Sequence, residues 1–157
     1  MPSALPFARL ASFYALFFAV LGTLSPYWGP YLRSEGFDAA AIGTLIAIVH
    51  ATKIVAPNLW GWVADVSGQR VLVIRLACFV ALFAFAGVFV EGGFFWMAMV
   101  MAAFSFFWNA ALPQIEALTF THLGEQTHRY PRIRLWGTVG FMLAVLLGGE
   151  AVDYYGA

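Results

Sequence analysis

Long apolar stretches follow one another through this chain of 157 residues and leave little room for anything else. A helix needs about 20 mostly apolar residues to cross a lipid bilayer, and five stretches are long enough. They cover residues 10–32, 39–63, 71–90, 94–120 and 133–152. Pro26 and Pro30 interrupt the first, and short polar segments connect all five, as is typical of antiparallel neighbours. The sequence therefore predicts an all-α, polytopic transmembrane helix bundle.

The composition agrees with an integral membrane protein. Hydrophobic residues make up 62% of the chain and charged residues only 10%, whereas a soluble domain carries roughly 25% charged residues. The formal net charge is zero, so the chain offers no basic surface for nucleic acid. Cys78 is the single cysteine, which excludes an internal disulfide. We expect a lipid bilayer as the surroundings of the chain and no nucleic acid partner.

The first apolar stretch has some features of a signal peptide. Arg9 precedes it, and Thr23-Leu24-Ser25 is a small-x-small site of the kind that signal peptidases cleave. The stretch is long for a signal sequence, however, and four more apolar stretches follow it. We therefore interpret it as the first membrane span.

The basic residues predict the orientation of the chain in the membrane. If the N-terminus is cytoplasmic, six arginines lie on or near the cytoplasmic side: Arg9, Arg70, Arg75, Arg129, Arg132 and Arg134. The other surface then holds only Arg33 among the basic residues and gathers the acidic side chains Glu35, Asp38, Glu91 and Asp153. Cytoplasmic loops of membrane proteins carry this excess of arginine and lysine. We expect a multi-pass protein of the plasma membrane, here a bacterial inner membrane, with a cytoplasmic N-terminus.

The segment GWVADVSGQR, residues 61–70, connects the second and third stretches. Asp65 and Gly68 have the spacing of a type I β-turn, which prefers aspartate first and glycine last. Asp65 also lies at the C-terminal end of its helix, where the negative end of the helix dipole disfavours an anion. It therefore needs a positive partner, either Arg70 or the N-terminus of another helix.

The same segment resembles the loop signature G-x-x-A-D-x-x-G-x-[RK] of the major facilitator superfamily. The matching residues are Gly61, Ala64, Asp65, Gly68 and Arg70. Val66 and Gln69 stand where basic residues are common in that family. In the family, the aspartate and the basic residues latch the N-terminal helices against a helix of the C-terminal half as the transporter alternates. The resemblance implies a conformational switch at this loop and not a substrate site.

Polar side chains also lie inside the fourth and fifth stretches. Asn109 and Glu116 are seven residues apart and share one helix face, and Arg134 and Phe141 repeat this spacing. A charge at the centre of a bilayer costs roughly 2.5–3.5 kcal/mol, so such residues usually face the bundle interior and pair. Antiparallel neighbours bring the end of one helix to the start of the next, so we expect Glu116 to reach Arg134. The alternative is that Arg134 extends to the membrane surface and serves only topology.

This region resembles the oligosaccharide–proton symporters and, still more, the phenylpropionate permeases. The residues that carry the resemblance are Glu116-Ala117-Leu118 and RIRLWGTVGF, residues 132–141. In the symporters, a glutamate and an arginine at these positions contact the sugar, and an aromatic residue seven positions after the arginine stacks on it. The resemblance implies that Glu116 and Arg134 bind substrate, with Phe141 at the stacking position. The symporters carry tryptophan there, which argues against a sugar.

Lys53 is a further charge, inside the second stretch. Either its side chain extends to the cytoplasmic surface, or it faces the cavity and supplies a second cation. By resemblance, a basic residue occupies this position in the phenylpropionate permeases. Two cations and one glutamate favour an anionic aromatic ligand, such as 3-phenylpropionate, over a neutral sugar. The candidate substrate-binding residues are Lys53, Asn109, Glu116, Arg134 and Phe141.

Gly140, Ala144 and Gly148 form a small-xxx-small stripe on the fifth stretch. Small residues at this spacing allow two membrane helices to approach closely. We therefore expect the fifth helix to pack tightly against a neighbour along this stripe.

The resemblance covers nearly the whole chain and implies five of the usual six helices of the N-terminal half, with the C-terminal half absent. It implies a secondary active transporter whose partners are a small organic solute, protons and that second half. Proton symport of a sugar or nucleoside is the alternative, as is a truncated membrane module that does not transport. The chain has no HExxH or GxSxG motif, so we expect no enzyme, no metal and no cofactor.

Overall fold

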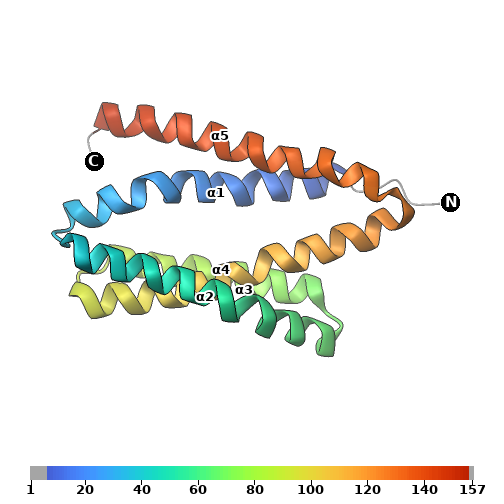
Figure 1. Cartoon of the computed structure of the whole chain (residues 1–157), viewed down its shortest axis with the longest axis horizontal. Helices are drawn as coiled ribbons and strands as arrows, with labels where there is room; N and C mark the ends of the chain where they lie inside the picture. Colours follow the sequence, from blue (N-terminus) through green and yellow to red (C-terminus); the bar gives the residue numbers. More distant parts are fainter. Residues whose placement is uncertain (1–6, 156–157) are drawn as a thin grey trace. The chain divides into compact units, whose positions relative to one another are not determined.

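The computed structural model of the chain describes residues 7–155 and consists of helices joined by short connections (Figure 1). The elements are α1 (Phe7–Ser34), α2 (Ala39–Ser67), α3 (Arg70–Ala86), η1 (Gly87–Phe89), α4 (Gly93–Leu123), η2 (Gly124–Arg129) and α5 (Tyr130–Tyr155). Within residues 7–155 no strand is present, which confirms the all-α prediction.

Among residues 7–155, four continuous helical stretches are long and apolar enough to cross a membrane: Phe7–Ser34, Ala39–Ser67, Arg70–Phe89 and Gly93–Val152. The last includes both α4 and α5, because the 3-10 helix η2 joins them with non-helical backbone angles only at Gln126. α4 has 31 residues and α5 has 26, so each exceeds the length of about 20 that a bilayer requires. The chain is a multi-pass membrane protein.

The chain divides into two compact units. Among the described residues, the first unit holds those up to Gly36 and those from Thr119 onward, so that α1 packs with α5. The second unit is Phe37–Leu118 and holds α2, α3 and most of α4.

In the first unit, α1 and α5 lie side by side along their lengths (Figure 1). At Gly140 the two backbones approach so closely that a Cβ atom would collide with the main chain of Ala15. A Cβ on Gly22 of α1 would collide with the carbonyl of Phe141. Gly148 makes room for the ring of Tyr27, whose hydroxyl donates to the carbonyl of Val145 at 2.7 Å. The predicted small-residue stripe on α5 is therefore the surface that packs against α1.

Pro26 and Pro30 do not interrupt α1, contrary to the prediction. The helix continues from Phe7 to Ser34 through both prolines. A proline removes one hydrogen bond from the helix ladder and crowds the carbonyl four residues earlier, and membrane helices tolerate this where neighbouring helices support the segment. Next to Pro26, the hydrogen bond from the Tyr27 hydroxyl to the carbonyl of Val145 connects this part of α1 to α5 and supplies such support.

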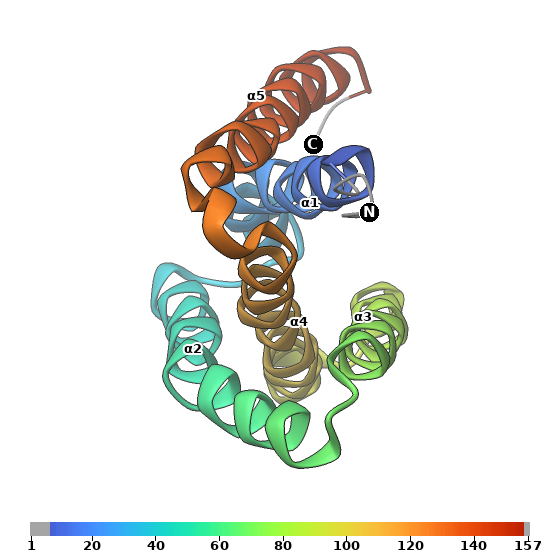
Figure 2. The same cartoon turned by 90° about the vertical axis from the view of Figure 1, so that its right-hand side faces the viewer.

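In the second unit, α4 lies between α2 and α3 (Figure 2). The indole N–H of Trp60 on α2 donates to the carbonyl of Phe106 on α4 at 3.2 Å. On the other side, the rings of Phe85 and Phe104 have centroids 5.1 Å apart. These contacts are made by large side chains, so the helices of this unit are spaced more widely than α1 and α5.

The connection between α2 and α3 is a helix end and not a type I turn, so the turn prediction is wrong. α2 continues through Asp65 to Ser67, and Gly68 takes a left-handed conformation with φ 66°. The N–H of Gly68 donates to the carbonyl of Ala64 at 3.0 Å and closes the helix. Glycine reaches positive φ without steric cost and is for that reason the usual residue at a helix C-terminus.

Candidate functional site

Arg134 lies in the second turn of α5, and its side chain turns toward α1. The central carbon of the guanidinium lies 3.9 Å from the ring centroid of Phe18 and 5.7 Å from that of Tyr14. Arg134 itself is half-buried. A guanidinium within about 6 Å of an aromatic face is attracted to it, and the attraction grows where water is excluded. Two rings of α1 thus hold the cation at a fixed place.

The ring of Tyr14 is in turn fixed by its own contacts. Tyr14 is fully buried, and its hydroxyl lies 3.3 Å from the hydroxyl of Thr119 at the end of α4. Its ring meets that of Tyr130 edge to face, and Tyr130 stacks on Phe120 with centroids 4.7 Å apart. The aromatic ring that flanks Arg134 therefore belongs to a packed cluster and has little freedom to move.

A guanidinium that lies over an aromatic ring is attracted to it without losing its charge and can keep N–H donors available for a ligand. The five donors of a guanidinium form a rigid fork that matches the two oxygens of a carboxylate. Within the described part of the first unit, no carboxylate is paired with Arg134. The arrangement can bind an anion through the edge of the guanidinium while the rings of Phe18 and Tyr14 keep it oriented.

A chain of polar side chains joins α2 to α4 in the second unit. The amide nitrogen of Asn109 donates to the hydroxyl of Thr52 at 3.3 Å, and that hydroxyl lies 2.8 Å from the hydroxyl of Ser105. Ser105 donates in turn to the carbonyl of Met101 at 2.7 Å. Asn109, a candidate substrate ligand, thus already uses one donor for helix packing and keeps its second amide hydrogen and its carbonyl oxygen.

The remaining candidate ligands occupy different places. Lys53 follows Thr52 on α2 and is exposed. Glu116 and Phe141 are both half-buried, on α4 and α5. Glu116 belongs to the second unit and Arg134 to the first, so their pairing stays a prediction.

Asp65 and Arg70 of the loop signature form an ion pair, as expected from the position of Asp65 at the end of α2. The other terminal nitrogen of Arg70 donates to the side-chain oxygen of Gln114 on α4 at 2.7 Å. Gln114 is only 2% exposed. Gly61 faces the same amide, because a Cβ at that position would lie 3.9 Å from its nitrogen. The loop is therefore tied to three helices.

Sequence reasoning missed Gln114. The signal was present, because an uncharged polar residue near the end of an apolar helix requires a hydrogen-bond partner. Phe18 was missed as well, and nothing in the sequence distinguishes it from its neighbours Phe13 and Phe17 on the same helix.

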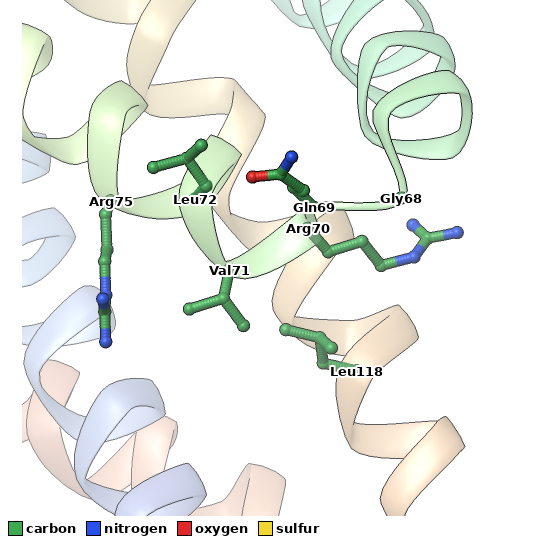
Figure 3. A pocket seen from close by; sticks show the side chains of 7 residues that line it. All are labelled: Gly68, Gln69, Arg70, Val71, Leu72, Arg75 and Leu118. Atoms are coloured by element: carbon green, nitrogen blue, oxygen red, sulfur yellow. The ribbon is translucent and has the colours of Figure 1, made fainter.

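A hollow of about 420 Å³ lies beside this loop, at the start of α3 (Figure 3). It is lined by Gly68, Gln69, Arg70, Val71, Leu72, Arg75 and Leu118. The side chains of Arg70 and Arg75 point in different directions from α3 (Figure 3). Two cations and an apolar wall thus share one hollow.

The sequence profile of the MFS_1-like family matches residues 7–157. Maltose permease of Geobacillus stearothermophilus is 33% identical over 144 residues, which cover 90% of this chain and 36% of that protein. The "Probable 3-phenylpropionic acid transporter" of Escherichia coli (strain K12) is 28% identical over 151 residues, or 93% of this chain and 38% of that protein. Another protein of that strain, named for nucleoside transport, is 28% identical over 127 residues, or 79% of this chain and 29% of the relative.

No solved structure matches the chain. The chain spans between 29% and 38% of the length of these relatives. The family match nevertheless includes all the described residues and both regions discussed above, the aromatic site of Arg134 and the loop that holds Asp65 and Arg70. The chain belongs to the MFS_1-like family of the major facilitator superfamily.

Proposed function

We propose that this chain is part of a secondary active transporter for a small organic solute. The three relatives are named as transporters of maltose, 3-phenylpropionic acid and nucleosides. Transporters of this kind bind their solute near the middle of the membrane and expose it to each side in turn. The chain would contribute one wall of that site, and the remaining wall would come from a C-terminal half.

The substrate that the site fits best is an aromatic carboxylate such as 3-phenylpropionate. One observation carries this choice: the Arg134 guanidinium rests on the face of Phe18, at 3.9 Å. Its N–H edge suits a carboxylate, and the surrounding rings suit an arene. Lys53 would supply a second cation, and Asn109 a hydrogen bond through the part of its amide that packing does not use.

Uptake would be coupled to protons. Glu116 is the candidate participant on this chain, because it is the carboxylate among the proposed substrate ligands and is half-buried. A carboxylate that loses and regains Arg134 as its partner would change its proton affinity during the cycle. With a cytoplasmic N-terminus, the Asp65–Arg70 loop would lie at the cytoplasmic surface and serve as the conformational switch.

A sugar is the second candidate substrate, favoured by the 33% identity to maltose permease. Phe141 would then stack on the sugar ring, and Glu116 and Arg134 would bind its hydroxyls. Phenylalanine offers a smaller face than tryptophan and no N–H donor, so the resulting site would bind a sugar less well.

Uptake into membrane vesicles tests the proposal, with the transporter that contains this chain and labelled 3-phenylpropionate, maltose and uridine. We expect uptake of the carboxylate, its loss in Arg134→Ala, and retention in the control Arg132→Ala, which alters an exposed arginine two residues away. Dissipating the proton gradient should abolish accumulation.

Uptake of maltose or uridine but not of the carboxylate would identify a sugar or a nucleoside as the substrate instead. No uptake of any compound would contradict the proposed solute, and equal loss in both arginine variants would contradict a specific role of Arg134.

A further inference from the structure

We propose that the hollow at the start of α3 binds the phosphate headgroup of an anionic phospholipid, with Arg75 as the cation that recognises it. This site is separate from the proposed substrate site, and its existence does not depend on which solute is transported. The inference rests on the unused charge in the hollow, on the apolar surface that continues from it, and on the length of that surface.

The two arginines of the hollow differ in what they already bind. Arg70 is committed to Asp65 and Gln114, so its charge is compensated within the protein. Arg75 is exposed, and within residues 7–155 it makes no ion pair and no hydrogen bond. No carboxylate lines the hollow. The hollow therefore carries one positive charge that no carboxylate of its lining compensates.

An apolar stripe begins at the hollow and continues along α3. Leu72 lines the hollow, and Leu76, Phe79 and Phe83 follow at helical spacing on the same face, all between 47% and 61% exposed. Arg75 lies on this face too, one turn after Leu72. A ligand that fills the hollow would thus have its anionic part beside Arg75 and an apolar part along the stripe.

The length of the stripe matches one leaflet of a bilayer. Leu72 and Phe83 are separated by a rise of about 16 Å along the helix, and one leaflet of the hydrocarbon core is about 15 Å thick. An acyl chain could lie against the stripe from end to end while its headgroup stays in the hollow. A free phosphate ion would use Arg75 but not the stripe.

Charge complementarity favours an anionic lipid over a zwitterionic one. Phosphatidylglycerol carries a net negative charge, whereas the choline group of phosphatidylcholine would bring a second cation close to Arg75. A basic residue near the membrane surface attracts an anionic lipid by about 1 kcal/mol, so we expect a preference of about fivefold.

The preference is measured by native mass spectrometry of the purified protein, titrated with phosphatidylglycerol or with phosphatidylcholine of the same acyl chains. Wild type should bind phosphatidylglycerol about fivefold more tightly. Arg75→Gln should lose this preference and Arg75→Lys should keep it. The matched control Arg132→Gln removes an exposed arginine outside the hollow and should behave as wild type. Leu76→Gln should weaken the binding of both lipids, whether or not Arg75→Gln folds.

Several outcomes would overturn the proposal. Equal binding of the two lipids by wild type would contradict recognition of the headgroup. A preference for phosphatidylglycerol that persists in Arg75→Gln would contradict the role of Arg75. Equal losses in Arg75→Gln and Arg132→Gln would indicate general attraction between charges. Displacement of the lipid by millimolar inorganic phosphate, with Leu76→Gln behaving as wild type, would identify a site for a free anion instead.

Discussion

The Arg134 guanidinium of α5 lies 3.9 Å from the ring centroid of Phe18 on α1, so a cation of one helix is held by the aromatic face of another. This contact joins the two helices of the first unit that pack along their lengths. It gives Arg134 a fixed position without neutralising its charge. The proposed binding of a carboxylate requires an arginine with this property.

Replacing Phe18 by leucine should weaken the binding of a carboxylate substrate. Leucine has similar bulk but no aromatic face, so the guanidinium loses an interaction worth roughly 0.5–2 kcal/mol. We expect KM for 3-phenylpropionate to rise about two- to thirtyfold with little change in the maximal rate of uptake. Phe18→Tyr keeps the ring and should behave as wild type. Equal effects of the two substitutions would show that bulk and not the aromatic face matters.

Replacing Gly140 by alanine should destabilise the first unit. The added methyl group collides with the main chain of Ala15, and overpacking of this kind costs about 1–3 kcal/mol. Gly43→Ala is the control, because a Cβ there enters open space and alanine favours a helix by up to about 1 kcal/mol. The midpoint of thermal unfolding in detergent should fall for Gly140→Ala and stay or rise for Gly43→Ala. The reverse order would contradict the close approach of α1 and α5.

Replacing Gln114 by leucine should loosen the loop between α2 and α3. A hydrogen bond to a charged group contributes about 1.5–3 kcal/mol, and Arg70 would keep only its ion pair with Asp65. Titration with a denaturing detergent should show a lower free energy of unfolding for Gln114→Leu. Gln126→Leu also removes an arginine contact, but an exposed one in η2, and should cost about 0–0.5 kcal/mol. An equal loss in both variants would argue against a special role of the buried amide.

Replacing Thr52 by valine should weaken the contact between α2 and α4. The substitution keeps the shape of the side chain and removes the hydroxyl that joins Asn109 to Ser105. Interhelical hydrogen bonds in membranes contribute about 0.6 kcal/mol on average and up to about 1.7 kcal/mol. Thr44→Val, which removes only a bond to the carbonyl of Ala40 in the same helix, is the control. The two free energies of unfolding should differ by this amount, and no difference would show that the polar chain does not stabilise the unit.

Some features of the molecule could be predicted because the sequence pattern behind each of them favours one structure. Apolar stretches of about 20 residues specify membrane helices, and the stripe of Gly140, Ala144 and Gly148 specifies a close helix contact. Asp65 at a helix C-terminus needed a cation, and Arg70 supplies it. Each of these follows from spacing along one helix or from a neighbour close in sequence.

Other features could not be predicted, because they depend on contacts between distant segments. The polar residues of α4 do not gather on one face, so its sequence shows that Gln114 needs a partner but does not identify Arg70 as that partner. Phe18 is one of several phenylalanines of α1, and only the packing against α5 selects it. The spacing of Asp65 and Gly68 suits both a β-turn and a helix end. The structure has the helix end, because α2 continues to Ser67 and the N–H of Gly68 donates to the carbonyl of Ala64.

The backbone contact at Gly140 limits how this site can change in evolution. Where two main chains touch, no side chain acts as a spacer whose length could be adjusted, so the distance between α1 and α5 is fixed at this point. A lineage that acquires a new substrate cannot shift Arg134 by sliding one helix along the other. It can only exchange the rings around the guanidinium, and Phe18 and Tyr14 are therefore the positions where relatives with different solutes should diverge first.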